Sequence, residues 1–205
     1  MQKKTAKQKK PLNLILLGDP AAGKATQAAF LVKKYHMHDF DMGQELRNRK
    51  RRDKKFNKQL KNSYDAGKLT QTAIVRKILR QTIISTPQRR GILFDGHPKM
   101  LGEAKIAHKL LRQHRRRDPV VLYLSIPLEE TVRRMQGRKD YFRGKFSKRT
   151  DDTSAALRNR VKYYRKNIAQ VVKFFKSKYY FKKINGLGSV SEIRQRLARA
   201  IEAKD

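Results

Sequence analysis

Short apolar runs alternate along the chain with longer stretches in which apolar residues recur every three or four positions. Strands are predicted at 12–17, 38–41, 91–95, 120–125 and 179–184, although 38–41 (His-Asp-Phe-Asp) holds a single apolar residue. Between them, 72–84 carries apolar residues at 74, 75, 78, 79 and 83, and 157–175 carries them at 157, 161, 164, 168, 171, 172 and 175. Such spacing lines one face of a helix, which we expect to pack against the core. The alternation of strands and helices is typical of an α/β fold with a parallel sheet.

Local signals mark where other helices begin. A helix-compatible run at 27–35 follows the first predicted strand. Pro127 can lie in the first turn of the helix after the fourth strand, where its missing N–H is not needed. Ser189 or Ser191 can cap the last helix ahead of Glu192.

A glycine-containing loop, Gly-Asp-Pro-Ala-Ala-Gly-Lys-Ala-Thr at 18–26, connects the first strand to its helix. Backbone N–H groups of such a loop, the positive end of the following helix and a lysine charge together bind a polyphosphate. A chance match in a turn is the alternative, and the flanking strand and helix argue against it. Ala25 stands where a magnesium-binding Ser or Thr is usual, and Thr26 comes one residue later. The loop predicts a nucleoside triphosphate site formed by Gly18, Ala21, Ala22, Gly23, Lys24, Ala25 and Thr26.

A second feature typical of a phosphate site is the run Ile-Leu-Phe-Asp-Gly at 92–96, where an apolar strand ends in an acid. At the carboxyl end of a strand beside the loop, Asp95 can hold the water shell of Mg²⁺, which neutralises phosphate charge. Many strands end in Asp at a turn, so the loop at 18–26 carries most of this interpretation.

Composition restricts the class of protein. The chain has 205 residues, 38% of them hydrophobic, which is enough for one core with a small insertion. The absence of cysteine excludes disulfides, thiolate zinc sites and a cysteine nucleophile. No run approaches the roughly 20 apolar residues of a membrane-spanning helix, and the lysine-rich N-terminus lacks the apolar stretch of a secretion signal. We therefore expect a soluble cytoplasmic protein.

The charge balance is extreme: 52 Lys and Arg against 17 Asp and Glu leave a net charge of +35. Cations concentrate in blocks at 3–10, 47–61 and 112–117. Each block is either a solvated surface or a site for a polyanion such as RNA. A nucleic-acid- or ribosome-binding protein built on the same scaffold therefore stays open as an alternative function.

Several arginines follow the fourth predicted strand, namely Arg134, Arg138, Arg149, Arg158 and Arg160. Their order after the loop at 18–26, the segment at 41–47, Gly-Lys-Leu at 67–69 and Asp-Gly-His-Pro-Lys at 95–99 resembles adenylate kinases from residue 12 to residue 201. The resemblance implies a monomeric P-loop protein with a three-layer fold around a five-stranded parallel sheet. It also implies a basic arm at 1–11 ahead of a kinase core at 12–205, a helical NMP-binding insertion at 42–71 and a short lid at 138–150. The implied reaction converts ATP and AMP to two ADP with Mg²⁺.

The resemblance also implies roles for single residues. Lys24 would contact the transferring phosphates, Asp95 the magnesium ion through water, and Arg134 the ATP adenine. Lys24, Arg138, Arg149 and Arg160 would be catalytic, with Arg138 also on the ATP side. The AMP side would include Met42, Arg47, Gly96, Lys99, Glu103, Arg149, Arg158 and Arg160. The His97–Pro98 peptide corresponds to one that is cis in the family.

The chain departs from the family pattern at several of these positions. Lys99 replaces an arginine on the AMP phosphate, and a point charge lacks the two-pronged fork, so we expect weaker AMP binding there. Met42 replaces a threonine, and Gln44 replaces an aspartate associated with the metal. Ala21 and Ala25 replace loop glycines, and a Cβ at Ala21 is penalised if that position needs a positive φ.

Glu103 stands where the family has a glutamine that contacts the AMP base. A carboxylate only accepts hydrogen bonds, so by this logic it suits the N1 and N2 donors of guanine better than adenine. The remaining motifs favour AMP, which is our first choice, with GMP as the alternative. Glu103 is equally compatible with a helix residue that never reaches the base. No general base is assigned, because the acceptor phosphate is already ionised near neutral pH.

Overall fold

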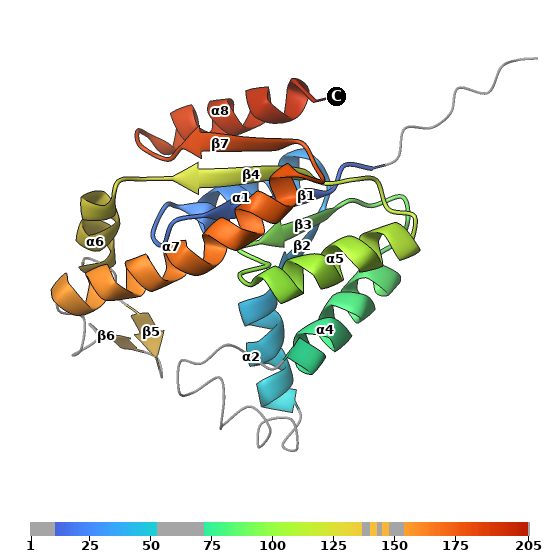
Figure 1. Cartoon of the computed structure of the whole chain (residues 1–205), viewed down its shortest axis with the longest axis horizontal. Coiled ribbons are helices and arrows are strands. Elements are labelled where there is room, and N and C mark those ends of the chain that lie inside the picture. The colour runs from blue at the N-terminus through green and yellow to red at the C-terminus, as the bar shows by residue number, and fades with distance from the viewer. Residues whose placement is uncertain (1–10, 53–71, 137–139, 143–144, 148–153, 205) are drawn as a thin grey trace, which may run out of the picture.

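The computed structural model describes residues 11–52, 72–136, 140–142, 145–147 and 154–204. Its centre is a five-stranded sheet in the order β2-β3-β1-β4-β7, and every neighbouring pair is parallel (Figure 1). The predicted α/β fold and its five strands are confirmed. The strands are β1 (Leu14–Gly18), β2 (His38–Asp41), β3 (Ile92–Asp95), β4 (Val120–Ser125) and β7 (Phe181–Asn185).

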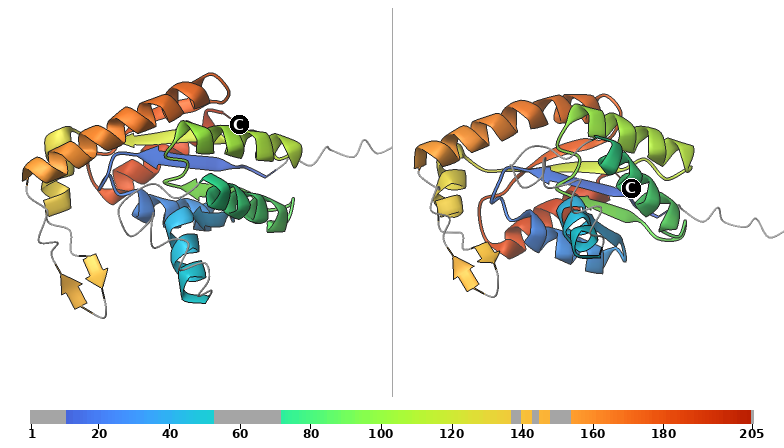
Figure 2. Two further views of the ribbon diagram at one scale, coloured as in Figure 1. Left: turned by 60° about the horizontal axis from the view of Figure 1, so that its bottom comes forward. Right: turned by 90° about the horizontal axis from the view of Figure 1, so that it is seen from below.

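Helices cover the sheet on both faces (Figure 1, Figure 2). One face packs against α4 (Thr72–Ser85), α5 (Leu101–Gln113) and α7 (Ser154–Lys176). The other packs against α1 (Lys24–Lys34) and α8 (Val190–Glu202). In β1, Ile15 and Leu17 join the first core while Leu14 and Leu16 join the second, because successive side chains of a strand point to opposite faces. This arrangement explains why β1 is apolar at every position instead of alternating.

The predicted apolar stripes of α4 and α7 are core faces. Val75, Ile78, Leu79 and Ile83 of α4 are at most 1% exposed. Along α7, the buried residues are Leu157, Val161, Ile168, Val171 and Phe175. These helices therefore owe their stability mainly to burial of one face.

Two predicted helix starts lie where the sequence placed them. Pro127 directly precedes α6 (Leu128–Gln136), and its carbonyl accepts a hydrogen bond of 3.0 Å from the Thr131 N–H. Ser189, not Ser191, caps α8. Its hydroxyl accepts from the Glu192 N–H at 3.2 Å, and the Glu192 carboxylate accepts from the Ser189 N–H at 2.6 Å.

Two smaller elements lie in the segments expected to form the insertion and the lid. Helix α2 (Met42–Arg52) stands out from the sheet directly after β2 (Figure 2). Strands β5 (Asp140–Phe142) and β6 (Lys145–Ser147) form an antiparallel pair within the range 138–150. Outside the described residues lie 1–10 of the expected basic arm, 53–71 of the expected insertion, and 138–139, 143–144 and 148–150 of the expected lid. Among the helices that the structure describes, none combines the length and apolarity needed to cross a bilayer.

Candidate functional site

A cavity of about 710 Å³ opens at the carboxyl ends of β1, β2 and β3. This edge is where ligands bind in parallel α/β sheets, because loops and helix N-termini converge there. Many of the sequence-predicted residues line it, namely Ala21, Ala22, Gly23, Lys24, Ala25, Thr26, Met42, Asp95, Gly96, Lys99 and Arg134. Gly18, Arg47, Glu103 and Arg158 are not among its lining residues. Arg138 and Arg149 lie outside the described residues, as does the side chain of Arg160, whose backbone is in α7.

The loop at 18–26 curls around the N-terminus of α1. Gly23 adopts φ 86° in the left-handed region and is the residue before the first helical turn. Gly18 is required for a different reason, because a Cβ there would lie 2.5 Å from the Leu124 carbonyl oxygen. With no acid in the first turn of α1, the positive end of that helix faces the cavity uncompensated.

Lys24 is the first residue of α1 and lines the cavity. Its Nζ donates to the carbonyl oxygens of Gly18 and Asp19, each at 2.8 Å. These bonds hold the ammonium against the loop, beside the space that a phosphate chain would occupy. The geometry therefore gives the loop both backbone donors and one full positive charge.

Ala21 has φ 57°, in the left-handed region. A side-chain Cβ in this conformation costs about 1–2 kcal/mol relative to glycine. The loop thus keeps a conformation that favours glycine in spite of the substitution, and the penalty expected from the sequence applies.

Asp19 was missed in the sequence analysis. Its carboxylate is buried, with 2% of the residue exposed, and turns away from the cavity. Oδ1 accepts from the Tyr123 hydroxyl at 2.9 Å and from Arg165 Nε at 3.0 Å, and Oδ2 accepts from the Ile126 N–H at 3.0 Å. A signal was available, because a carboxylate in an anion-binding loop must be neutralised or directed elsewhere.

Two side chains of helix α7 anchor the loop and the end of β4. Arg165 also donates from Nη2 to the Ile126 carbonyl at 2.7 Å, and the Tyr164 hydroxyl donates to the Gly18 carbonyl at 3.0 Å. Burial, together with Asp19, raises the pKa of the Tyr123 phenol well above its ordinary value, so the phenol stays a donor. One network thus joins the loop, the end of β4 and α7.

Two carboxylates lie side by side at the cavity edge. Asp41 and Asp95 are register partners at the ends of β2 and β3, and both line the cavity. The pKa of Asp95 is raised to about 6, mainly by burial and secondly by the Asp41 carboxylate. Lys24 acts in the opposite direction. Such a pair attracts a cation, which would remove the repulsion between the two groups.

The donor set fits a hydrated magnesium ion. The described residues contain no cluster of three or more His, Cys, Asp or Glu side chains suited to a metal. Mg²⁺ characteristically uses one or two carboxylates together with water and substrate phosphates, which the position of Asp95 near the loop permits. Asp41 has a second task, since its Oδ1 caps α2 by accepting from the N–H groups of Gly43 at 2.7 Å and Gln44 at 3.2 Å.

The predicted AMP side is built on α2 and on the turn after β3. Arg47 Nη2 donates to Gln44 Oε1 at 2.9 Å and lies 3.7 Å from Asp41 Oδ2, which keeps its guanidinium beside the cavity mouth. Met42 is buried and Lys99 is exposed, and both line the cavity. The His97–Pro98 peptide is cis, as the resemblance implied.

Glu103 is a buried capping residue of α5. Its Oε2 accepts from the backbone N–H groups of Lys99 at 2.8 Å and Met100 at 3.2 Å. His97 Nδ1 lies 3.6 Å away, but burial lowers the pKa of His97 to about 3, so this contact joins a carboxylate to a neutral ring. Of the interpretations left open by the sequence, the geometry favours a helix residue that does not contact a base.

Two of the predicted site arginines, Arg134 of α6 and Arg158 of α7, have different surroundings. Arg134 lines the cavity, donates from Nε to Glu130 at 2.6 Å and reaches the Ala21 carbonyl at 3.4 Å. Arg158 instead forms a two-pronged pair with Glu129, in which Nη2 lies 2.6 Å from Oε2. Arg134 is therefore beside the loop already, and Arg158 is tied to α6.

The sequence of this chain is similar to the sequences of known proteins. A family model described as adenylate kinase matches residues 16–180. An adenylate kinase of Leptospira biflexa is 32% identical over 189 residues, covering 92% of this chain and 98% of the relative. Adenylate kinases of Phocaeicola vulgatus, at 28%, and Methanothrix thermoacetophila, at 26%, each align with 93% of this chain and 98% of their own length. The matches include every segment that lines the cavity.

Proposed function

The chain belongs to the adenylate kinase family, and from this premise we propose the substrates and metal of its site: ATP as donor, AMP as acceptor and Mg²⁺. Membership makes the protein a phosphotransferase that acts on nucleoside monophosphates. The observation that carries the proposal is the convergence of Lys24, Asp95 and Arg134 on one cavity at the carboxyl edge of the sheet.

The donor side is proposed to bind ATP through the loop at 18–26. Backbone N–H groups and the N-terminus of α1 would surround the β- and γ-phosphates, and Lys24 would exchange its carbonyl partners for phosphate oxygens. Arg134 lies against the loop at Ala21, in a position to pack on the adenine as the family resemblance implies. Asp95 and the neighbouring Asp41 would hold Mg²⁺ through water, and the ion would neutralise phosphate charge.

The proposed step is an in-line transfer. An oxygen of the AMP phosphate bonds to the γ-phosphorus while the bond to the β–γ bridging oxygen breaks, which leaves two ADP molecules. No side chain needs to remove a proton, because the AMP phosphate is largely ionised near neutral pH. The chain contributes position and positive charge, which are what phosphoryl transfer requires of a protein.

Arginines would supply the remaining charge. From the family resemblance we assign Arg138, Arg149, Arg158 and Arg160 to the phosphoryl groups, and Arg47 and Lys99 to the AMP phosphate. Arg158 would have to leave Glu129 to reach a phosphate, so its engagement couples substrate binding to the contact between α6 and α7. Arg47 is similarly held by Gln44 and Asp41 until an anion replaces them.

AMP is proposed as the acceptor, since Glu103 does not line the cavity and its Oε2 accepts from the backbone N–H groups of Lys99 and Met100 at the start of α5. The test is an acceptor panel in which AMP, GMP, CMP and UMP are compared with ATP and Mg²⁺. AMP should give the highest kcat/KM, and Lys24→Ala supplies the background rate. A preference for GMP would overturn the assignment of the acceptor while leaving the family membership intact. A cytoplasmic location and a monomeric state stay predictions from the sequence.

A further inference from the structure

A groove of about 530 Å³ runs between α4 and α5, which lie side by side in all views (Figure 1, Figure 2). It shares no residue with the phosphate cavity. Its walls carry cations and its floor is apolar. The lining residues are Arg76, Arg80, Ile106, Lys109, Leu110, Gln113 and His114.

The two helices that form the groove present cations without exposed acids. Arg76, Lys77 and Arg80 of α4 and Lys105, Lys109 and Arg112 of α5 are all exposed. The only acid in either helix is Glu103, which is buried and bonded to backbone N–H groups. The positive charge of this surface is therefore not neutralised by carboxylates of its own helices.

Among the described residues, no carboxylate pairs with the cations of the groove walls. Within the part of the chain that the structure describes, none of Arg76, Arg80 and Lys109 forms an ion pair. By contrast, Arg116 of the neighbouring basic block is buried and donates to backbone carbonyls of residues 83–90. The groove cations are thus available for a ligand, while part of the block at 112–117 is structural.

The spacing of these cations suits a linear polyanion. Arg76 and Arg80 are four residues apart on α4, a step of about 6 Å along the helix axis, and Lys109 lines the groove from α5. Three cations spread over this length match successive phosphates of an extended nucleic-acid strand better than a single small anion. A groove between two packed helices also admits one strand more readily than a duplex.

We propose that the α4–α5 groove binds the phosphodiester backbone of single-stranded RNA without sequence preference. Arginine forks match phosphate oxygens, and a chain of net charge +35 gains strongly from releasing the counterions of a polyanion. Apart from the His114 imidazole, the described residues that line the groove include no aromatic ring, so base stacking contributes little and phosphate contacts dominate. Because this site is separate from the nucleotide cavity, we expect bound RNA not to block the kinase reaction.

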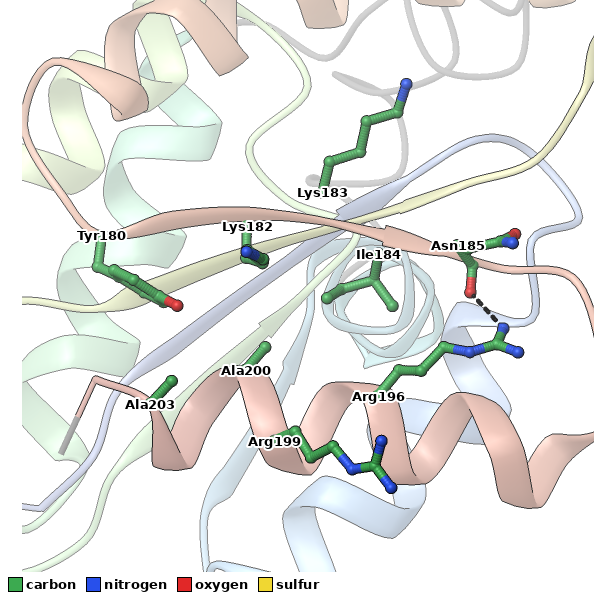
Figure 3. Close-up of a pocket in the computed structure, with 9 residues that line it drawn as sticks. All are labelled: Tyr180, Lys182, Lys183, Ile184, Asn185, Arg196, Arg199, Ala200 and Ala203. Carbon is green, nitrogen blue, oxygen red and sulfur yellow. Dashed lines mark hydrogen bonds between the residues drawn. The ribbon is translucent and has the colours of Figure 1, made fainter.

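A second basic surface provides a matched control. The groove between the edge strand β7 and α8 is lined by Tyr180, Lys182, Lys183, Ile184, Asn185, Arg196, Arg199, Ala200 and Ala203 (Figure 3). There Arg196 is bound to the Asn185 carbonyl at 3.0 Å, and Lys183 points away from α8 on the other side of the strand from Ile184. Lysines on an edge strand also serve to prevent edge-to-edge pairing. Lys183 and the cations of α8 thus lie on different sides of the strand, so removing these charges should weaken RNA binding less.

The test compares two triple variants of the full chain with equal net charge. The first is Arg76→Gln, Arg80→Gln, Lys109→Gln, and the control is Lys182→Gln, Lys183→Gln, Arg199→Gln. Binding of a fluorescent oligouridylate is measured by anisotropy across a salt series, with thermal melts to verify folding. The groove variant should bind about tenfold or more weakly and reduce the slope of log K against log salt by about 2, from three lost contacts at ~0.7 each. The control should stay within about twofold of wild type.

Turnover of ATP and AMP should be the same in wild type and both variants, because the groove is separate from the catalytic cavity. If both triple variants lose equal affinity, net charge alone explains the binding and the site assignment is overturned. Unchanged affinity in the groove variant overturns it as well. So does displacement of the RNA by polyglutamate at an equal concentration of charges, because an acidic peptide is then an equal ligand. Should the groove variant melt early, the single reversal Arg80→Glu replaces it and must still weaken binding more than Lys183→Glu.

Discussion

The Asp19 carboxylate in the phosphate loop accepts a hydrogen bond of 3.0 Å from Nε of Arg165 on α7, 146 positions further along the chain. Asp19 is buried, while the Arg165 side chain is 37% exposed. The pair fixes the loop relative to the helix that also carries Arg158 and Arg160. We therefore expect the alignment of the two proposed nucleotides to depend on a contact outside the cavity.

Arg165→Ala should destabilise the protein by about 2–3 kcal/mol, because it leaves a buried carboxylate with fewer donors. It should also reduce kcat by about 10–100-fold through displacement of the loop. Urea unfolding and steady-state kinetics measure the two effects. Lys166→Ala, at an exposed neighbouring position, is the control. If the Arg165 substitution costs the same free energy in an Asp19→Asn background as in wild type, the two residues are not coupled.

Ala21→Gly should raise the free energy of unfolding by about 0.5–1 kcal/mol, because glycine adopts φ 57° without the Cβ penalty. Ala22→Gly in the same loop should instead destabilise. Ala22 is 0% exposed and has no positive φ, so its replacement loses packing and adds entropy to the unfolded chain. Denaturant unfolding measures the stability of both variants. A loss of stability in Ala21→Gly would show that Ala21 is not strained.

Asp95→Asn should stabilise the folded protein at pH 7.5 in EDTA by about 1–2 kcal/mol, allowing for partial exposure. Burial and Asp41 raise the pKa of Asp95 from 3.8 to about 6, so between these values the folded state binds more protons than the unfolded state. The contribution of Asp95 to the free energy of unfolding consequently falls as pH rises through this window. Below about pH 4 the variant and wild type should melt together. A gain of equal size at every pH would contradict the raised pKa.

Arg116→Met should destabilise the protein by about 3 kcal/mol, since it removes a buried guanidinium that donates to several backbone carbonyls. Arg116 donates to the carbonyls of Ile83 at 2.9 Å, Pro87 at 3.1 Å and Arg90 at 2.9 Å. Arg112→Met, at an exposed position of the same block, should change stability by less than about 0.5 kcal/mol. If thermal melts show equal losses of stability in the two variants, the contacts of Arg116 stabilise the fold no more than an exposed arginine does.

The sequence predicted the elements better than it predicted the partners of single side chains. The strands at 38–41 and 120–125 have the expected bounds. The run at 120–125 is apolar and long enough for one buried strand, whereas 38–41 contributes a single buried side chain, Phe40. The first and last strands are displaced toward the C-terminus. The Tyr179 N–H is one reason, since it bonds to Phe175 at 2.8 Å in the turn that ends α7.

The cavity-lining part of the loop was predictable because its residues are contiguous and their geometry is local. The contacts of Asp19 were not predictable in this way, since Arg165 and Tyr123 are brought to it only by the packing of α7 and β4. Glu103 shows the opposite problem. Family position suggested a base contact, whereas the local backbone at Lys99 and Met100 uses the carboxylate as a cap.

Product stoichiometry tests whether this cavity transfers a phosphoryl group from ATP to AMP with Lys24 on the phosphates. Equimolar ATP and AMP with Mg²⁺ should yield two ADP for each ATP consumed. Lys24→Ala should lower the rate by about a hundredfold or more, the scale of lost transition-state electrostatics. Lys33→Ala, an exposed lysine of the same helix, should leave the rate unchanged. ADP formation without loss of AMP, or equal rates in wild type and Lys24→Ala, would contradict the account.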